Sequence, residues 1–349
     1  MSTQKALFLQ SRLGTFAVGT CDIPTPEQGE LLVEIHATAL NPVDWKIQTY
    51  DGGIIQEYPA ILGTDCAGIV KAVGEGVTDF AIGDRVLHQG LFVNRKATFQ
   101  QYTTVPAQLA AKIPSNLSFD EASTIPLTMA TAALGLYNKS IQPFGGAALS
   151  PPWEEGGRGK YAGQPIVVLG GASSVGQHVI QFAKMSGFSP IITTASVRHE
   201  DYLKSLGATH VIDRSISLAS LPAEVAKVTT EPVLVAYDAV SDAATQNAAF
   251  DVLAPGGKVV VMPPPQIDAQ KLVDGREVIQ VMGNVHVPGQ TPVGVSLYGR
   301  LTALLEAGDI KPNNVEVLPD GLAGIPDGLE RLKRGVSAKK LIVRPQDTI

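Results

Sequence analysis

The sequence predicts an α/β protein of two domains: a doubly wound parallel sheet with helices on both faces, and a second, β-rich domain. Three observations lead to this fold class. The chain has 349 residues, a length that fits two domains better than one. Its first third places apolar residues at alternate positions between glycine-containing turns. From Pro165 onward, short apolar runs alternate with helical segments.

Residues 31–38 show the pattern of the first third. One side of this segment is apolar, with Val33 and Ile35 among its members, and the other becomes polar, which is typical of a half-buried strand. Shorter strands are expected at 68–73 and 85–87. A last strand at 340–343 is expected to return to this first part of the chain.

The second part is predicted to hold six strands, most of them separated by helical segments of about ten to twenty residues, a spacing that favours a parallel sheet. A helix is expected to begin after Ser118, which can act as N-cap with Glu121 three positions later. Residues 143–163 are rich in Gly, Pro and charge and predict a long surface loop, which is either a functional rim or a disordered segment. The expected strands are 166–169, 191–194, 210–212, 234–239, 258–262 and 278–282.

Composition argues against several classes of protein. The net charge of −6 argues against a nucleic-acid-binding protein, which needs a clustered basic surface. No apolar run reaches 18 residues and the start lacks the apolar core of a signal peptide, so we expect no membrane association. The two cysteines, Cys21 and Cys66, are consistent with a reducing compartment, and a cytoplasmic location is expected.

The strongest chemical signal is the segment 167–177, where a buried strand ends in glycines and an amphipathic helix begins. Glycines allow the backbone to approach a pyrophosphate, and the helix N-terminus offers N–H groups and a positive dipole end. A tight turn without a ligand is the alternative. The strand before, the helix after and a second strand about 20 residues later favour a dinucleotide site. The residues expected to bind the cofactor here are Gly170, Ala172, Ser173, Ser174, Val175 and Gly176.

The end of the next strand favours NADPH over NADH. An NAD site usually carries Asp or Glu at this place, whereas this chain has Ser196 and Arg198, which can bind a 2′-phosphate. A solvated loop arginine is the structural alternative. Glu200 and Asp201 follow closely and leave open an acid on a ribose hydroxyl.

No metal site is predicted. Zinc sites need thiolate, imidazole or carboxylate ligands at recognisable spacing. Neither cysteine lies in a CxxC pair, and the six histidines are scattered. Cys66 is interpreted as a small buried residue.

Several motifs in consistent order resemble the medium-chain dehydrogenase/reductase superfamily over nearly the full length. They are residues 39–46 (ALNPVDWK), 61–68 (ILGTDCAG), 73–86 (from VG to GDRV), 206–213 (LGATHVID) and 335–343. The resemblance implies a Rossmann NADPH-binding domain at 118–305. It also implies a GroES-like catalytic domain made of 1–117 and 306–349.

Three differences indicate the zinc-free branch of this superfamily. Zinc alcohol dehydrogenases carry Cys within the segment matching 41–44 and Gly-His-Glu in place of Gly63-Thr64-Asp65, and they often have a four-cysteine lobe that is absent here. The Asn-Pro-x-Asp form of residues 41–44 is similar to quinone oxidoreductases and enoyl reductases. Residues 44–46 and the loop at 151–155 resemble fungal enoyl reductases that serve polyketide synthases in trans. This implies a small-molecule or carrier-bound acyl substrate, a polyketide synthase as a partner, and a monomer or homodimer.

Without zinc to polarise a carbonyl, the expected reaction is NADPH-dependent reduction of an α,β-unsaturated carbonyl, either an enoyl thioester or an enone. The resemblance implies that Lys46 and Thr131 contact the ribose and nicotinamide end of the cofactor, that Asn41 shapes the substrate cleft and that Tyr50 is a candidate proton donor. Each has a structural alternative, such as a solvated Lys46, a Thr131 bonded to its own helix or a turn role for Asn41.

Two other functions stay open. A quinone or aldehyde/ketone reductase of the same superfamily is the alternative enzyme. A catalytically silent, NADPH-binding structural protein is the alternative of another class.

Overall fold

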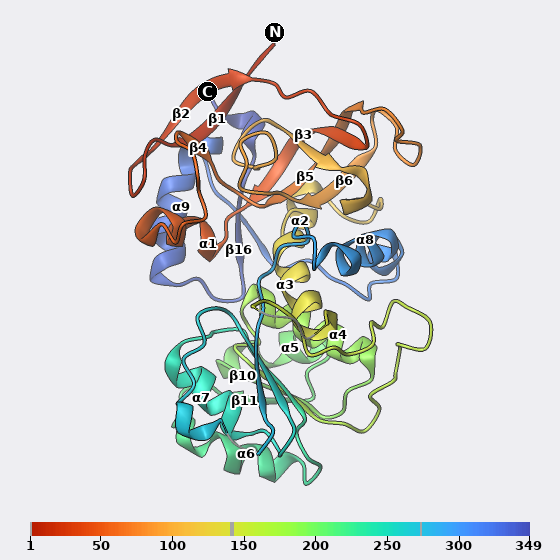
Figure 1. The fold of residues 1–349 in the computed structure, drawn as a ribbon, viewed down its shortest axis with the longest axis vertical. Helices are drawn as coiled ribbons and strands as arrows, with labels where there is room; N and C mark the ends of the chain where they lie inside the picture. The colour runs from red at the N-terminus through yellow and green to blue at the C-terminus, as the bar shows by residue number, and fades with distance from the viewer. Residues whose placement is uncertain (1, 140–142, 273) are drawn as a thin grey trace. The chain divides into compact units, whose positions relative to one another are not determined.

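The structure is a computed structural model that describes residues 2–139, 143–272 and 274–349. The chain forms two compact units. The first comprises Met1–Leu127, Val295–Gly308 and Pro312–Ile349, and the second comprises Thr128–Gly294 with Asp309–Lys311. Each unit has its own sheets, as Figure 1 shows.

The second unit is built on a six-stranded, fully parallel sheet in the order β11-β10-β9-β12-β13-β14. The chain runs outward from the central β9 to β11, then crosses back to β12 on the other side of β9. This order is that of a Rossmann sheet, whose ligands bind at the carboxyl ends of the strands where the order reverses. The strands are β9 (Ile166–Leu169), β10 (Ile191–Ala195), β11 (His210–Asp213), β12 (Val235–Asp238), β13 (Lys258–Val261) and β14 (Glu277–Gln280).

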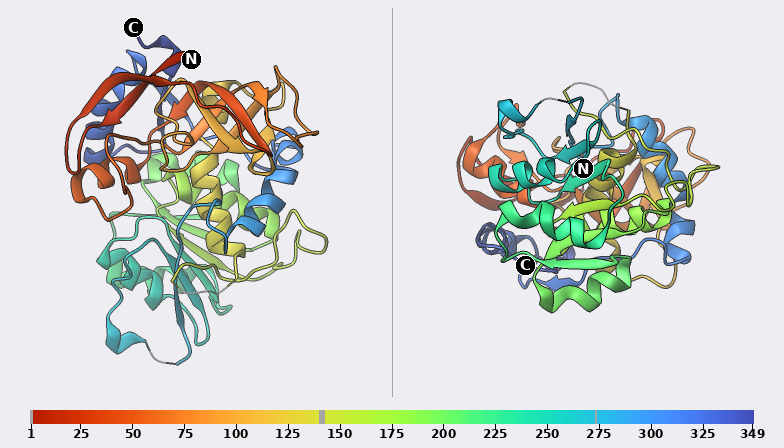
Figure 2. Two further views of the ribbon diagram at one scale, coloured as in Figure 1. Left: turned by 45° about the horizontal axis from the view of Figure 1, so that its top comes forward. Right: turned by 90° about the horizontal axis from the view of Figure 1, so that it is seen from below.

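Helices lie along both faces of this sheet (Figures 1 and 2). Helices α6 (Leu221–Val228) and α7 (Ala243–Asp251) share an apolar cluster with Val167 and Ala236. Successive strand residues point to opposite faces, so Val168 and Tyr237 face the other side. There Tyr237 packs against Gly135 of α3 (Pro126–Tyr137), and α4 (Ser174–Ser186) contacts α3 through Phe182. Helix α5 (Glu200–Leu206) contacts α4.

The first unit is β-rich. One sheet has the order β15-β16-β3-β5-β6-β8, with β7 paired to β3, and a smaller sheet has the order β2-β1-β4. The last strand, β16, pairs antiparallel with β3, which confirms that the C-terminal strand returns to this unit. The strands are β1 (Thr3–Leu9), β2 (Phe16–Asp22), β3 (Glu30–Ala39), β4 (Ala60–Ile61), β5 (Asp65–Val73), β6 (Arg85–Gln89), β7 (Tyr102–Pro106), β8 (Ala110–Lys112), β15 (Val315–Val317) and β16 (Lys340–Val343).

Helices of this unit include α1 (Pro42–Tyr50), α2 (Phe119–Ala122) and α9 (Ile325–Arg334), while α8 (Thr291–Glu306) begins in the second unit and ends in the first. The expected helix start at Ser118 is confirmed. The Ser118 hydroxyl accepts a hydrogen bond from the Glu121 N–H at 3.2 Å, and the Glu121 carboxylate accepts one from the Ser118 N–H at 2.9 Å.

The segment 143–163 is a loop anchored by aromatic side chains. Trp153 is buried, with its ring centroid 5.0 Å from that of Tyr137 and 5.5 Å from that of Phe182. Tyr161 stacks on Phe188 at 5.0 Å. The packing of these rings gives the segment a defined place on the second unit, a feature that its Gly, Pro and charge content did not indicate.

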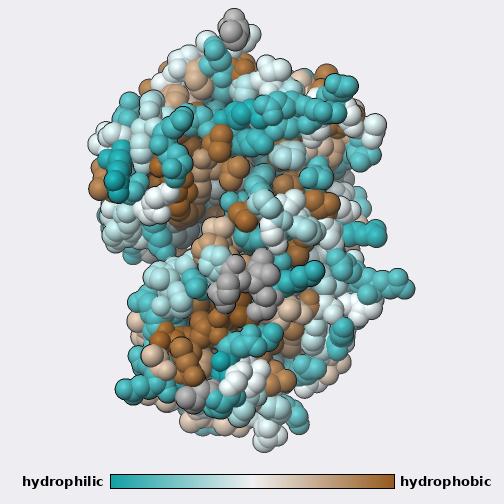
Figure 3. Space-filling model, in the orientation of Figure 1, coloured by the Kyte–Doolittle hydropathy of each residue, from teal (hydrophilic) through white to brown (hydrophobic). Residues whose placement is uncertain are grey.

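Exposed apolar side chains are scattered over the described surface. Leu13, Tyr50 and Ile82 are among the most exposed, and Figure 3 shows hydrophobic and hydrophilic residues interspersed on one face. Within the described residues, no helix has both the length and the apolar character to span a membrane.

Candidate functional site

The turn after β9 has the backbone geometry expected of a dinucleotide site. Gly170 has a φ of +75°, which favours glycine. A Cβ on Gly171 would lie 2.1 Å from the Thr193 hydroxyl oxygen, so only glycine lets these strands and the turn approach so closely. The Gly170 N–H donates to the Thr194 hydroxyl at 3.1 Å, which ties the turn to β10.

Helix α4 begins immediately after this turn. Ser173 is its N-cap, and its hydroxyl accepts a hydrogen bond from the Gly176 N–H at 3.0 Å. The first N–H groups of a helix have no intrahelical acceptor, so those of Ser174 and Val175 are the groups available to an anion. The turn and the start of the helix therefore fit a pyrophosphate, whereas the Ser173 hydroxyl caps the helix.

The neighbouring strand end, β12, is ordered by Asp238. This carboxylate is buried, and its Oδ1 accepts hydrogen bonds from the N–H groups of Val240 and Ser241 at 2.9 and 3.0 Å. Burial raises the pKa of Asp238. The two central strands, β9 and β12, are thus each followed by a hydrogen-bonded turn at the point where the strand order reverses.

Thr131 lies on α3 beside the same edge of the sheet. Its backbone carbonyl accepts a hydrogen bond from Tyr237 Oη at 2.9 Å. Its hydroxyl lies against Gly283, where an added Cβ would come within 1.9 Å of Thr131 Oγ1. Gly283 follows the carboxyl end of β14, so Thr131 and the glycine turn after β9 belong to one edge of this sheet.

The segment after β10 is cationic. Arg198 is exposed and its Nε donates a hydrogen bond to the ring of His199 at 3.2 Å. Burial, followed by the charges of Arg198 and Arg214, lowers the pKa of His199. Glu200, which the sequence left open as a ribose ligand, pairs with Lys204 at 2.7 Å. Ser196 is half-buried beside this group.

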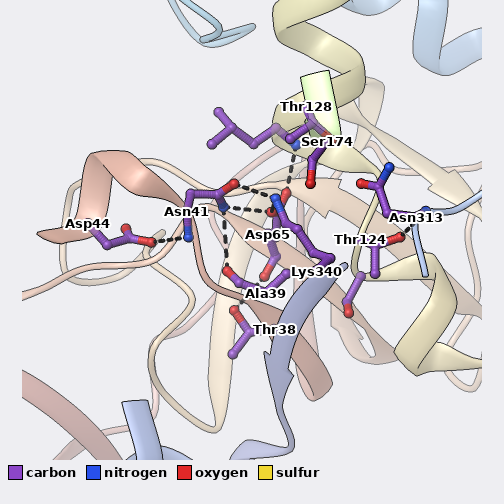
Figure 4. Close-up of polar contacts among 12 residues, drawn as sticks. Thr38, Ala39, Asn41, Asp44, Asp65, Thr124, Thr128, Ser174, Asn313 and Lys340 are labelled. Atoms are coloured by element: carbon purple, nitrogen blue, oxygen red, sulfur yellow. Dashed lines mark hydrogen bonds and ion pairs between the residues drawn. The ribbon is translucent and has the colours of Figure 1, made fainter. Parts of the chain in front are cut away.

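The first unit contains a buried cluster of charged and polar groups, shown in Figure 4. The Lys340 ammonium lies 3.4 Å from Asp65 Oδ2 and donates to Asn41 Oδ1. Asn41 Nδ2 donates to the same Asp65 oxygen at 2.7 Å, and Asp65 Oδ1 accepts the Leu127 N–H at 2.6 Å. The side chains of Asp65 and Lys340 are 0% and 4% exposed.

Asp44 extends this cluster into helix α1. Its Oδ2 accepts the N–H of Asn41, the N-cap residue, at 2.8 Å. Burial raises the pKa of Asp44 to about 7; the N–H of Asn41 lowers it, and the charge of Asp65 adds to the rise. Burial also lowers the pKa of Lys340, against the opposing effect of Asp65.

The residues at the zinc-ligand positions do not fit a zinc ion. Both oxygens of Asp65 are already engaged, one of them by a cation. Cys66 is next to it on β5 and therefore points to the opposite face of the strand, and burial raises the pKa of its thiol well above the ordinary value. In the part of the chain that the structure describes, no group of three or more His, Cys, Asp or Glu side chains could hold a metal.

The remaining predicted residues lie on the surface of α1. Lys46 is exposed, with its Nζ 5.9 Å from the ring centroid of Trp45. Tyr50 is 68% exposed at the end of the helix, and its ring centroid lies 6.1 Å from that of Trp45. Asn41 is fully buried, and its side chain is bonded to Asp65 and Lys340 within the cluster.

Sequence reasoning missed Lys340 and Arg214. Lys340 lies 299 positions from Asn41, and no local pattern connects them. Arg214 could have been noticed, because it follows β11, the strand beside β10, and the carboxyl ends of neighbouring parallel strands meet at one edge.

Replacing Asp44 by Asn tests the burial of this carboxyl. The unfolded chain ionises Asp44 near its ordinary pKa of 3.8, and the folded chain near 7. Between these values each pH unit removes about 1.4 kcal/mol of stability from the parent. The free energy of unfolding of the parent, relative to Asp44→Asn, should therefore fall by roughly 4 kcal/mol from pH 4 to 7 and level off above.

Denaturant unfolding at a series of pH values makes this measurement. Asp84→Asn is the control, because the N–H of Ala81 and Lys112 lower the pKa of Asp84. The free energy of unfolding of the parent, relative to Asp84→Asn, should rise with pH, because the folded chain lowers the pKa of Asp84. A pH-independent difference between the parent and Asp44→Asn would contradict the assignment.

Comparison with known proteins places these features in a family. The family description "Alcohol dehydrogenase GroES-like domain" matches residues 27–115, and "Zinc-binding dehydrogenase" matches 174–290. The chain is 34% identical to the trans-enoyl reductase himH of Aspergillus japonicus, over 96% of this chain and 95% of that protein.

Solved structures agree. An alcohol dehydrogenase superfamily protein from Novosphingobium aromaticivorans is 26% identical with a TM-score of 0.79, covering 98% of this chain and 99% of that one. A mycobacterial protein complexed with NADPH has the same fold, with a TM-score of 0.77 at 23% identity, covering 98% of this chain and 100% of that one. The chain belongs to the medium-chain dehydrogenase/reductase superfamily and is an oxidoreductase of that kind, similar to fungal trans-enoyl reductases.

Proposed function

We propose that this protein is a zinc-independent reductase that uses NADPH to reduce the double bond of an α,β-unsaturated carbonyl compound, such as an enoyl thioester or an enone. The observation that carries the proposal is that one sheet edge holds both a glycine turn with a capped helix after β9 and a cationic segment after β10. The name of the relative himH, a trans-enoyl reductase, supports the class of substrate.

The cofactor preference rests on charge. The N–H groups of Ser174 and Val175 suit the pyrophosphate, and Arg198 with Arg214 suits a further phosphate on the adenine ribose. A 2′-phosphate carries negative charge, so guanidinium groups bind it strongly, and bidentate bonds add geometric selectivity.

Conjugate reduction suits a site without a metal. When bound, NADPH supplies the hydride that is added to the β-carbon of the substrate. Negative charge then collects on the carbonyl oxygen, and preorganised N–H or O–H donors stabilise it. The α-carbon takes a proton from a protein group or from water, which completes the saturated product.

Two side chains have proposed roles in this reaction. The hydroxyl of Thr131, held beside the sheet edge by α3 and Gly283, is proposed to contact the nicotinamide. The ammonium of Lys46 is proposed to bind ribose hydroxyls or to supply the proton. Tyr50 is a second candidate for the proton, since its hydroxyl is on an exposed side chain of the same helix.

A panel of acceptors tests the function. The purified protein, incubated with chelator and analysed for zinc, is given NADPH with enones, enoyl thioesters, quinones and aldehydes. We expect oxidation of NADPH with the unsaturated thioesters or enones, unchanged by chelator, and no stoichiometric zinc. Turnover confined to quinones or aldehydes would support the alternative enzyme, and binding of NADPH without turnover on any acceptor would support a structural protein.

Arg198→Ala tests cofactor choice. Loss of a charge-assisted bond should weaken NADPH binding by on the order of 1.5–3 kcal/mol, while NADH binding changes little, because only NADPH carries the 2′-phosphate. Calorimetric titration of both cofactors measures this, with Lys227→Ala as a control, since Lys227 is an exposed cation on α6 that pairs with Glu224. Equal losses for the two cofactors would show that Arg198 does not bind the 2′-phosphate.

Thr131→Val and Lys46→Met test the proposed contacts one at a time. A lost positioning contact can cost about a hundredfold in rate, so each variant should lose at least about tenfold in single-turnover NADPH oxidation. NADPH affinity should change little, because the pyrophosphate and adenine contacts remain. Thr49→Val on α1 is the control, and full turnover in either variant would remove that residue from the mechanism.

A further inference from the structure

Among the residues that the structure describes, Lys340 is the only buried lysine. The proposed reaction does not use it. Its ammonium bridges two segments, around Asn41 and around Asp65, that match the zinc-ligand segments of zinc alcohol dehydrogenases. The residues there do not fit zinc. The cation that lies between the two segments is the side-chain ammonium of Lys340.

The contacts around this cation form a closed set. Lys340 Nζ reaches Asp65 Oδ2 and Asn41 Oδ1, and Asn41 Nδ2 reaches the same Asp65 oxygen. The other Asp65 oxygen accepts the N–H of Leu127, in the first turn of α3. The cluster therefore joins the start of α1, the start of β5, the start of β16 and the first turn of α3.

Stability alone is a weak reason for such a cluster. Taking two charges out of water is costly, and well-packed apolar side chains in place of a buried ion pair are often as stable or more stable. A buried pair does, however, fix geometry, because each partner accepts few positions once its hydrogen bonds are made. What this cluster fixes is the N-cap of α1, since Asn41 is held by its side-chain oxygen, its side-chain nitrogen and its N–H.

Helix α1 carries Lys46 one turn beyond the N-cap. We propose that the Lys340 ammonium occupies the region that matches the metal site of zinc alcohol dehydrogenases, and that Lys340 is a positioning residue for the reduction. It acts through Asn41 to hold α1 and Lys46 in place. This proposal rests on the proposed function for the role of Lys46. It predicts that removal of the cation affects turnover more than cofactor binding.

The test compares Lys340→Met with Lys339→Met. Lys339 is the adjacent residue, exposed and paired with Glu316, so its loss removes a lysine without touching the cluster. In Lys340→Met, we expect faster hydrogen–deuterium exchange in α1 than in the parent, measured against β1 as an internal reference. We also expect turnover at least about tenfold lower, with NADPH affinity within about threefold of the parent. Lys339→Met should change none of these.

A double variant separates positioning from folding. Lys340→Met leaves the Asp65 carboxylate buried without its cation, and Asp65→Asn combined with it removes that charge while keeping the acceptor for Leu127. The double variant should recover the stability lost in the single one, yet stay low in turnover and leave the KM for the acceptor nearly unchanged. Parent-like turnover in the double variant would overturn the proposal, as would unchanged exchange in α1 of Lys340→Met.

Turnover is measured with whichever acceptor the parent reduces. If the parent reduces none, the proposed function fails. Hydrogen–deuterium exchange in α1 of Lys340→Met then tests only whether Lys340 holds α1 in place. Faster exchange than in the parent supports this role, and unchanged exchange overturns it.

Discussion

A buried ammonium and a buried carboxylate hold together four parts of the first unit that lie far apart in the chain. Lys340 and Asp65 are nearly inaccessible to water, and each is satisfied through Asn41, so the loss of any one leaves a charged or polar group without compensation. This constraint explains why Asn41 lies inside the protein rather than on a surface. It also links the start of α1, with Lys46 one turn later, to β16, the C-terminal strand that lies between β15 and β3.

The same cluster bears on the chemistry. A zinc ion would need ligands where this protein has Asn41, Thr64 and an Asp65 already paired with a cation. The proposed reaction is compatible with such a site, because conjugate addition places the charge on an oxygen that hydrogen-bond donors can stabilise without a Lewis acid. The second unit supplies the complementary feature for the proposed cofactor, since free N–H groups follow β9, and Arg198 and Arg214 follow β10 and β11.

Local features were predictable and long-range pairings were not. The bounds of β9 and β16 agree to the residue with the expected 166–169 and 340–343, because each is a short apolar run with clear flanks. The strand expected at 278–282 runs from Glu277 to Gln280, although the N–H of Val281 still donates to the carbonyl of Val261 on β13 at 2.9 Å.

Predicting the rest would have required knowledge of tertiary contacts. Trp153 is buried against rings from two helices, although its neighbours are glycine, proline and glutamate. Lys340 begins an apolar strand and resembles a terminal surface lysine until its partners are known. The role of Asn41 at a substrate cleft stays a prediction from the resemblance, whereas its bonds to Asp65 and Lys340 are long-range contacts that no local pattern indicates.

The position of the transferred hydride tests the central claim most directly. Zinc-stripped protein is given NADPH carrying deuterium at the reactive carbon of the nicotinamide, together with an α,β-unsaturated thioester or enone, and the product is analysed by NMR. The proposed reaction predicts deuterium on the β-carbon of a saturated carbonyl product. Deuterium on the carbonyl carbon of an alcohol product, or a reaction that returns only when zinc is restored, would contradict it.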